Sequence, residues 1–289
     1  MEQVLLPRYE LLNMIGRGGH SLVFRALDRE RLIEVAIKVL HPSLASDSAH
    51  AIRMRRECHA MLELSGTSAV RVIELCEAHN GALCLVMELL VGKDLDGYLS
   101  AIASWDVPVP WDTLIDLLEP IIDTLEIAHS RGIVHRDLKP GNIYVLDPAH
   151  GGGVRLIDFG LVKLIHAEPL TQAGFVVGSP SYMAPEVWNG DPKRIDHRVD
   201  VYSLGAIVFR ALSGSVPFEA QRIAEKLRLA TTAERPSLYD RRPDLPPHVD
   251  EWVCRALAIE PDERFGSVRE LWESFREIVH DRPSLSAAV

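Results

Sequence analysis

Short apolar runs separated by turn residues dominate roughly the first ninety residues of the chain. Apolar and β-branched runs of this length, bounded by turn residues, predict β-strands. The runs are Tyr9–Ile15, Leu22–Leu27, Glu34–Leu40 and Leu83–Leu90. Before the last run, Ser46 or Asp47 can cap a helix that continues to about Leu64. One helix within an antiparallel sheet predicts a small α+β lobe.

After Gly92 the apolar positions recur at steps of three and four residues, which is typical of a buried helix face. These positions are Leu114, Leu117, Leu118, Ile121, Ile122, Leu125 and Ala128. Two short strands are then expected at Ile143–Leu146 and Val154–Ile157. Helical patterns dominate from Arg198 to His280. The sequence therefore predicts a second, larger lobe that is mainly helical.

The change of pattern places the boundary between the lobes near Leu90–Lys93. We expect a small lobe at residues 1–90, a large lobe at residues 91–280, and a frayed tail at residues 281–289. A cleft between two lobes is a favoured place for a small-molecule site.

Composition narrows the class of protein. The 289 residues are enough for two lobes with a large core, and the net charge of −10 argues against a nucleic-acid surface or a basic membrane patch. The four cysteines are scattered without a CxxC pair, so we expect reduced thiols rather than disulfides or zinc. No apolar run approaches the roughly 18–20 residues that span a bilayer, and the N-terminus lacks a signal core. We expect a cytoplasmic protein, or the cytoplasmic domain of a longer one.

Two motifs carry the strongest chemical information. The run from His135 to Asn142 reads His-Arg-Asp-Leu-Lys-Pro-Gly-Asn, and Asp158-Phe159-Gly160 follows shortly after. Asp137 can orient an attacking hydroxyl and accept its proton, and Lys139 can meet the charge on a transferred phosphoryl group. Asn142 and Asp158 can supply oxygen ligands to Mg²⁺ (Mn²⁺ is an alternative). Together and in this order, the motifs predict phosphoryl transfer from ATP.

A glycine-rich segment, Gly16-Arg17-Gly18-Gly19-His20-Ser21-Leu22-Val23, precedes them. Glycines let backbone amides approach phosphates, and Val23 can cover one face of a purine. Ser21 takes the place of the third glycine in the usual GxGxxG pattern. By itself the segment is equally compatible with a simple hairpin turn.

Lys38 follows Val35, Ala36 and Ile37 in an otherwise apolar strand. It can be an edge-strand lysine that reaches solvent, or a lysine held against ATP phosphates by a helix carboxylate. Glu57, nineteen residues later, is the candidate partner, and Glu63 near the helix end is the alternative.

On these motifs the chain resembles a eukaryotic-type protein kinase catalytic domain and, within that family, the bacterial serine/threonine kinases. The resemblance covers Tyr9 to His280 and implies the two-lobed α+β kinase fold. It also includes Ala184-Pro185-Glu186, Asp200 and Arg264. It implies a Glu186–Arg264 ion pair and an Asp200 that holds the catalytic-loop backbone. Lys139 resembles the serine/threonine branch, and Ser179 stands where a threonine usually contacts Asp137.

The resemblance also implies the nucleotide contacts. Met87 would be the gatekeeper, Glu88 and Leu90 would offer backbone hydrogen bonds, and Asp94 would reach the ribose. Tyr144 is a departure, since an aliphatic residue is usual on the adenine floor. The full expected set is Ile15, Gly16, Gly18, Ser21, Val23, Ala36, Lys38, Met87, Glu88, Leu90, Asp94 and Tyr144.

Arg136 suggests regulation, because in the family such an arginine often binds a phosphorylated activation-loop residue. Thr171 is the only threonine between Asp158 and Glu186, and its phosphate could pair with Arg136, Lys163 and Arg53. The position two residues later, a second threonine in many relatives, is Ala173. We therefore expect activating autophosphorylation at Thr171; the alternative is an exposed threonine without a role.

Three hypotheses follow from the sequence. The first is a kinase that phosphorylates Ser and Thr hydroxyls of protein substrates. The second is a pseudokinase, which degraded motifs would favour, and the third is a small-molecule kinase with the same ATP site. The Ala184–Glu186 segment favours a protein acceptor. Pairing of two small lobes into a homodimer is also compatible with the resemblance.

Overall fold

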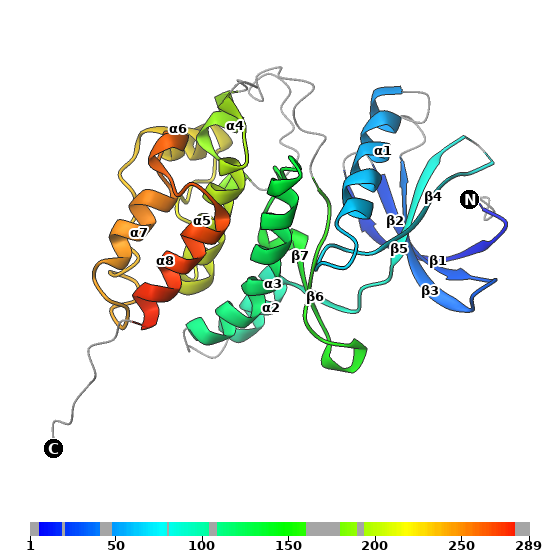
Figure 1. The fold of residues 1–289 in the computed structure, drawn as a ribbon, viewed down its shortest axis with the longest axis horizontal. Helices are drawn as coiled ribbons and strands as arrows, with labels where there is room; N and C mark the ends of the chain where they lie inside the picture. Colours follow the sequence, from blue (N-terminus) through cyan, green and yellow to red (C-terminus); the bar gives the residue numbers. More distant parts are fainter. Residues whose placement is uncertain are drawn as a thin grey trace.

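The computed structural model describes residues 6–18, 21–40, 48–79, 81–103, 109–159, 180–189 and 194–280, apart from the side chains of residues 48, 49, 53, 102, 103 and 189. Figure 1 shows a sheet-rich part that carries α1 (Ser48–Glu63) and a helical part that contains the helices from α4 (Pro185–Asn189) to α8 (Val268–His280). Both the expected fold class and the expected order of the lobes are confirmed. The predicted tail at residues 281–289 lies outside the described residues.

The small lobe is built on a five-stranded antiparallel sheet with the order β1-β2-β3-β5-β4. Its strands are β1 (Tyr9–Arg17), β2 (Ser21–Asp28), β3 (Ile33–Leu40), β4 (Val72–Glu77) and β5 (Leu83–Glu88). The sequence predicted all of these except β4. Its run Val-Ile-Glu-Leu-Cys-Glu has glutamates at its third and sixth positions and does not alternate between apolar and polar residues. Pairing with β5, rather than a strong local pattern, makes it a strand.

Helix α1 (Ser48–Glu63) packs against β4 and β5. It presents Met54, Cys58 and Met61 to the interior. The segment that follows α1 is fastened to the large lobe, because Val70 N donates to Leu156 O (2.9 Å) and Leu156 N donates to Ser68 O (2.7 Å). Movement of this end of the small lobe is therefore limited by backbone hydrogen bonds to the other lobe.

A second sheet, β6-β7-β8, begins the large lobe. Its strands are β6 (Gly92–Asp94), β7 (Ile143–Leu146) and β8 (Val154–Leu156). Strands β7 and β8 were predicted, whereas β6 was not, because three residues carry no periodic pattern. Pairing of β6 with β7 brings Asp94 opposite Tyr144.

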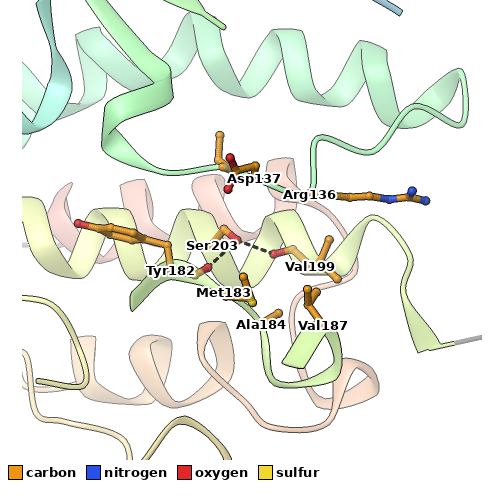
Figure 2. A pocket seen from close by; sticks show the side chains of 9 residues that line it. Arg136, Asp137, Tyr182, Met183, Ala184, Val187, Val199 and Ser203 are labelled. Atoms are coloured by element: carbon orange, nitrogen blue, oxygen red, sulfur yellow. Dashed lines mark hydrogen bonds between the residues drawn. The ribbon is translucent and has the colours of Figure 1, made fainter. Parts of the chain in front are cut away.

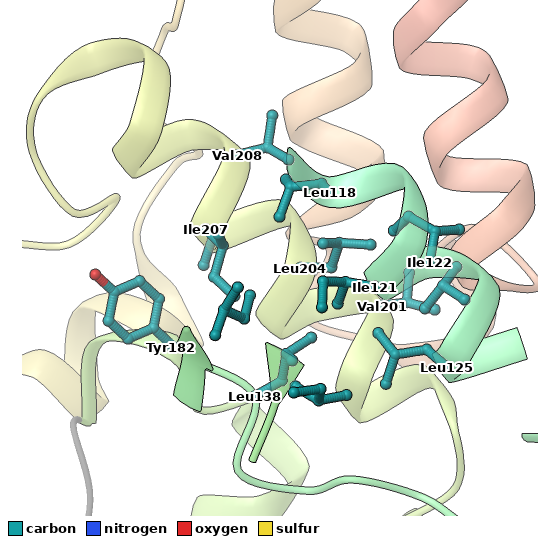
Figure 3. Close-up of a cluster of buried hydrophobic side chains, with 14 of the residues drawn as sticks. Leu118, Ile121, Ile122, Leu125, Leu138, Tyr182, Val201, Leu204, Ile207 and Val208 are labelled. Atoms are coloured by element: carbon teal, nitrogen blue, oxygen red, sulfur yellow. The ribbon is translucent and has the colours of Figure 1, made fainter. Parts of the chain in front are cut away.

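The helices of the large lobe surround α5, of which almost every residue is buried. They are α2 (Leu95–Ala103), α3 (Trp111–Ser130), α4 (Pro185–Asn189), α5 (Arg198–Ser213), α6 (Ile223–Thr232), α7 (Val249–Ala256) and α8 (Val268–His280), with short 3-10 turns η2 (Pro140–Asn142), η3 (Pro148–His150), η4 (Pro180–Tyr182) and η6 (Pro261–Glu263). Side chains of α3, including Leu118 and Leu125, interdigitate with α5 side chains such as Leu204 (Figure 3). The predicted apolar face of α3 is therefore a core face. Among the described helices, none combines the length and the apolar character that crossing a bilayer requires.

Candidate active site

Lys38 of β3 lies between two carboxylates at the junction of the lobes. Its Nζ is 2.6 Å from Glu57 Oε1 on α1 and 2.8 Å from Asp158 Oδ1, which follows β8. The Lys38 and Glu57 side chains are 13% and 6% exposed. Lys38 is thus not a solvent-facing edge lysine. Its partner is Glu57 rather than Glu63, which instead pairs with His59.

The charges around Lys38 stabilise its ammonium form. Burial by itself would lower the pKa of Lys38, but the neighbouring Asp158 and Glu57 outweigh it and raise that pKa above its usual value. The positive charge of Lys38 in turn lowers the pKa of Asp158. A permanent cation and an ionised carboxylate therefore lie side by side, one from each lobe.

The catalytic-loop residues converge on Asp137. Lys139 Nζ donates to Asp137 Oδ2 (2.9 Å), and Asn142 Nδ2 donates to the Asp137 carbonyl (2.8 Å). The turn η2 returns the chain so that Asn142, which is buried, faces Asp137. Since the Asn142 amide nitrogen is used in this bond, its oxygen is the atom available to a metal ion.

Asn142 immediately precedes β7, and Asp158 follows the neighbouring strand β8 by two residues. Ile157 N donates to Asn142 O (2.9 Å), which places the next residue, Asp158, beside Asn142. An amide oxygen and a carboxylate form the oxygen donor set that Mg²⁺ prefers, so these two side chains fit the expected ion. The described residues contain no cluster of three or more His, Cys, Asp or Glu that could hold a metal by itself.

Asp200 of α5 fixes the backbone of the catalytic loop. Its buried carboxylate accepts hydrogen bonds from the amides of His135 and Arg136, both at 2.8 Å. These bonds stabilise Arg136 at φ +64°, a conformation that non-glycine residues rarely adopt. The role expected for Asp200 is confirmed.

His129 was not predicted as part of this arrangement. Its Nε2 lies 2.8 Å from Asp200 Oδ2, at the end of α3. The only sequence signal was a histidine six residues before His135, which is too common to single out. Its contribution depends on the packing of α3 against α5.

The backbone at Asp158 is also unusual, with φ +57°. The next residue, Phe159, is 1% exposed, and its ring lies 4.8 Å from the ring of His135. Burial of Phe159 leaves Asp158 directed toward Lys38. Gly160, the third residue of the motif, lies outside the described residues.

The expected purine contacts lie along β3, β5 and the segment after β5. Ala36 pairs with Met87 in the sheet. Glu88 N already donates to Arg71 O (3.0 Å), so the backbone atom of Glu88 available to a purine is its carbonyl. Leu90 is partly buried against the main core.

The residues expected beside the ribose and below the adenine, Asp94 and Tyr144, each form a hydrogen bond within the large lobe. Asp94 Oδ1 accepts a hydrogen bond from Gly97 N (2.7 Å) at the start of α2. Tyr144 OH donates to Gly92 O (3.1 Å), which directs the phenol toward the backbone of β6. The unusual tyrosine is therefore accommodated by a hydrogen bond within the large lobe.

The glycine-rich segment forms the hairpin between β1 and β2. Gly16 lies opposite Val23, and Gly18 N donates to Ser21 O (2.8 Å). Ile15 is 48% exposed. The hairpin and phosphate-loop interpretations are thus compatible, since the turn joins strands beside Lys38. Gly19 and His20 lie outside the described residues.

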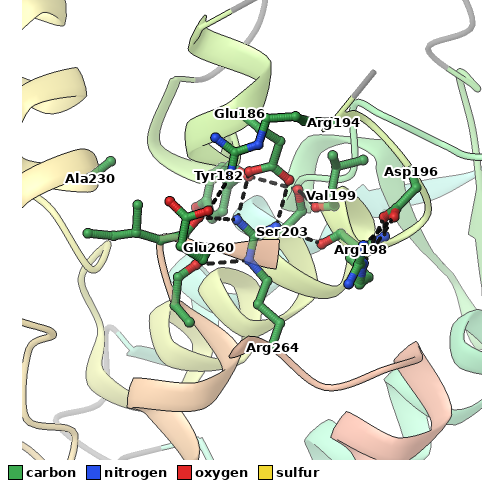
Figure 4. A network of polar contacts seen from close by, with 12 residues as sticks. Tyr182, Glu186, Arg194, Asp196, Arg198, Val199, Ser203, Ala230, Glu260 and Arg264 are labelled. Carbon is green, nitrogen blue, oxygen red and sulfur yellow. Dashed lines mark hydrogen bonds and ion pairs between the residues drawn. The ribbon is translucent and has the colours of Figure 1, made fainter. Parts of the chain in front are cut away.

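Behind the catalytic loop, Arg264 forms a bidentate ion pair with Glu186, with both N···O distances 2.7 Å (Figure 4). The two side chains are 0% and 2% exposed. The pair expected from the sequence is confirmed. Ser203 of α5 donates to Tyr182 O and Val199 O. The segment Tyr182–Ala184 lines a small pocket together with Asp137 and lies beneath it in the view of Figure 2. Thr171 and Ser179 lie outside the described residues.

Comparison with known proteins is consistent with this geometry. Residues 9–278 match the protein kinase domain family, so the chain belongs to that family.

Several curated relatives are bacterial serine/threonine kinases. Pkn3 of Myxococcus xanthus is 32% identical over 289 residues, which cover 97% of this chain and 52% of pkn3. PksC of Streptomyces coelicolor is 35% identical over 272 residues, which cover 91% of this chain and 48% of PksC. The chain spans about half the length of these curated relatives.

The fold also matches a solved structure, the kinase domain of PknI from Mycobacterium tuberculosis. The TM-score is 0.72 at 26% identity, covering 95% of this chain and 98% of that domain. The resemblance inferred from the sequence is therefore confirmed.

Proposed function

We propose that this chain is the catalytic domain of a serine/threonine protein kinase, which transfers the γ-phosphoryl group of ATP to Ser and Thr hydroxyls of proteins. The main support is the convergence of Lys38, Glu57 and Asp158 from two lobes beside the Asp137–Lys139–Asn142 cluster. The names of the bacterial relatives support the acceptor class.

In this proposal each side chain has one role. Lys38 binds the ATP phosphates and is positioned by Glu57, while Asn142 and Asp158 would hold Mg²⁺, which when bound neutralises charge on the phosphates. Asp137 orients the acceptor hydroxyl and accepts its proton as the new O–P bond forms and the bond to ADP breaks. Lys139, 2.9 Å from Asp137, meets the negative charge on the transferred group.

Two alternatives have less support. A pseudokinase would be favoured by the loss of one of these groups, yet all of them are present. A small-molecule kinase would not need the Ala184–Glu186 segment, which the buried Glu186–Arg264 pair fixes beneath Asp137. A protein acceptor explains why a buried ion pair holds this segment in place.

Incubation with Mg²⁺, ATP and a library of Ser- and Thr-containing peptides, followed by mass spectrometry, tests the proposal. We expect phosphate on Ser or Thr, and a rate that falls roughly 10²–10⁴-fold in Asp137→Asn, because the general base is lost. Glu225→Gln, on the exposed face of α6, is the matched control. Near-normal turnover in Asp137→Asn would exclude the assigned role, and ATP-dependent labelling of small molecules alone would favour the third hypothesis.

We also propose that autophosphorylation at Thr171 activates the enzyme. Thr171 lies outside the described residues, and the support comes from Arg136. Burial lowers the pKa of Arg136, and its Nε has no hydrogen-bond partner among the described residues. A phosphate at Thr171 would supply the missing acceptor and compensate the partly buried charge.

Phosphopeptide mapping and kinetics of Thr171→Ala test this second proposal. We expect phosphate at Thr171 and at least a tenfold lower rate in the variant, with Thr231→Ala on α6 as the control. An unmodified Thr171 together with full activity of Thr171→Ala would contradict it.

Location and assembly are further proposals. We place the domain in the cytoplasm, where ATP is available. Exposed apolar side chains of the small lobe, namely Leu12, Met14, Leu32 and Ile33, support a homodimer of small lobes. Comparing the sedimentation of the wild type with that of Leu32→Glu would detect the homodimer.

A further inference from the structure

A cavity of about 220 Å³ lies on the side of the small lobe where α1, β4 and β8 meet. Its apolar lining comes from Met61 and Leu62 at the end of α1, together with Ala69 and Val72. Its polar lining comes from Ser65, Thr67, Arg71, Glu88 and Arg155. One water occupies roughly 30 Å³ in the liquid, so the cavity is several waters large.

The charges of this lining have a definite sign. Glu88 Oε1 accepts hydrogen bonds from Arg71 N (2.8 Å) and Arg155 Nε (3.2 Å). Arg155 thus balances Glu88, whereas Arg71, which is solvent-exposed at the rim of the cavity, has no ion-pair partner for its guanidinium in the part of the chain that the structure describes. The lining therefore carries one excess positive charge beside an apolar surface.

A single positive charge beside an apolar surface indicates which class of ligand the cavity can bind. A guanidinium binds a carboxylate through two parallel hydrogen bonds, and the apolar side chains favour a hydrocarbon body. A dianion such as phosphate would meet the Glu88 carboxylate with only one unpaired cation available. The lining thus fits a small monocarboxylate with an apolar body.

The cavity is also linked to the expected nucleotide site through Glu88. The Glu88 side chain lines the cavity, while its backbone is expected to contact the purine on the opposite side of the same segment. Arg155, on β8 two residues before Ile157, connects the same carboxylate to the strand that leads to Asp158. An anion that draws Arg155 away from Glu88 would alter both connections.

We propose that this cavity is an effector site for small apolar monocarboxylates, and that its occupation changes nucleotide affinity. The binding part stands on the lining by itself. The linkage part rests on the proposed nucleotide site.

Binding is tested first, without nucleotide, by titrating the protein with phenylacetate and following its amide resonances by NMR. We expect saturable binding with a Kd of roughly 0.1–1 mM, which suits a ligand of this size. The uncharged isostere phenylacetamide and inorganic phosphate should each bind roughly tenfold more weakly, because one lacks the charge and the other the apolar body.

Two variants locate the site. Arg71→Gln should weaken phenylacetate roughly tenfold, and Leu62→Trp should abolish binding, because Leu62 is 50% exposed and a larger ring there fills the cavity. The matched controls, Arg228→Gln on α6 and Leu12→Trp on β1, should bind like the wild type. Equal binding of acid and amide, or an unchanged Kd in Arg71→Gln, would overturn the binding proposal.

Linkage is tested by measuring the Kd of a Mg²⁺-bound ATP analogue with and without saturating phenylacetate. We expect a change of roughly fivefold or more, with an equal change in the phenylacetate Kd when nucleotide is bound. An unchanged Kd for the analogue would refute the linkage. A protein that binds phenylacetate but not the analogue would refute the nucleotide site instead.

Discussion

At the scale of the residue, the buried charges of Lys38 and Asp28 are explained by their immediate partners. Lys38 is almost fully buried, and its charge is compensated by carboxylates at 2.6 and 2.8 Å. Asp28 is completely buried, and Arg8 donates to it through Nε (2.9 Å) and Nη2 (2.5 Å). A buried ion is tolerated when it is both paired and hydrogen-bonded.

The Arg8–Asp28 pair predicts a pH dependence of stability. Hydrogen bonds from Arg8 lower the pKa of Asp28 to about 2, below its ordinary value of 3.8. Because the folded-state pKa is depressed, the stabilisation is complete above pH 4 and disappears as the pH falls through about 2. In Arg8→Met, the loss of stability relative to the wild type should be largest at neutral pH and should shrink toward pH 3.

Urea unfolding of wild type and variant between pH 7 and pH 3 measures this effect. Arg31→Met is the control, because only the backbone amide of Arg31 binds Asp28 and it remains in the variant. A stability difference that stays constant over this pH range would show that the pair does not titrate as described.

At the scale of the element, the polar contacts of α5 organise the large lobe. Asp200 holds the catalytic loop at one side of the helix, and Ser203 one turn later holds the segment around Tyr182. Arg264, which lies in the segment before α8, forms an ion pair with Glu186 of α4. It also donates a hydrogen bond to Arg198 O at the start of α5. The segment from Tyr182 to Glu186 is thus held by side chains of α5 and α4 together with Arg264, which lies between η6 and α8.

Breaking the Glu186–Arg264 pair should therefore be costly. In Glu186→Gln the buried guanidinium loses its counter-charge, and we expect the free energy of unfolding to fall by about 3–5 kcal/mol. Urea denaturation measures it. The control is Glu225→Gln, whose exposed pair with Arg228 spans 3.7 Å and should contribute less than about 1 kcal/mol. Equal effects of the two substitutions would contradict this account.

At the scale of the whole molecule, the candidate site exists only because two lobes meet. One apolar cluster runs from Met54 and Leu85 of the small lobe to α3 and α5 of the large lobe. The Val70–Leu156 hydrogen bonds fasten the lobes at the same junction. A nucleotide bound between Lys38 and Asp158 would add a further connection.

Nucleotide should therefore stabilise the folded chain. At a hundred times its Kd, a Mg²⁺-bound ATP analogue contributes about 2.7 kcal/mol, which raises Tm by roughly 5 °C or more. The shift should shrink when EDTA removes Mg²⁺, and it should be lost in Lys38→Met. Lys226→Met, which removes a contact to Ser181 far from the nucleotide site, should retain it. A full shift in Lys38→Met, measured by differential scanning fluorimetry, would argue against the proposed phosphate contact.

The sequence by itself determined the elements with strong local patterns, such as β3 and α3, and the motifs of the family, because both depend on residues close together along the chain. Only the tertiary structure decided between Glu57 and Glu63, made strands of β4 and β6, joined His129 to Asp200, and formed the cavity behind Glu88. These depend on contacts between residues far apart in the sequence, and a distance across the fold leaves no periodic signal in a single chain.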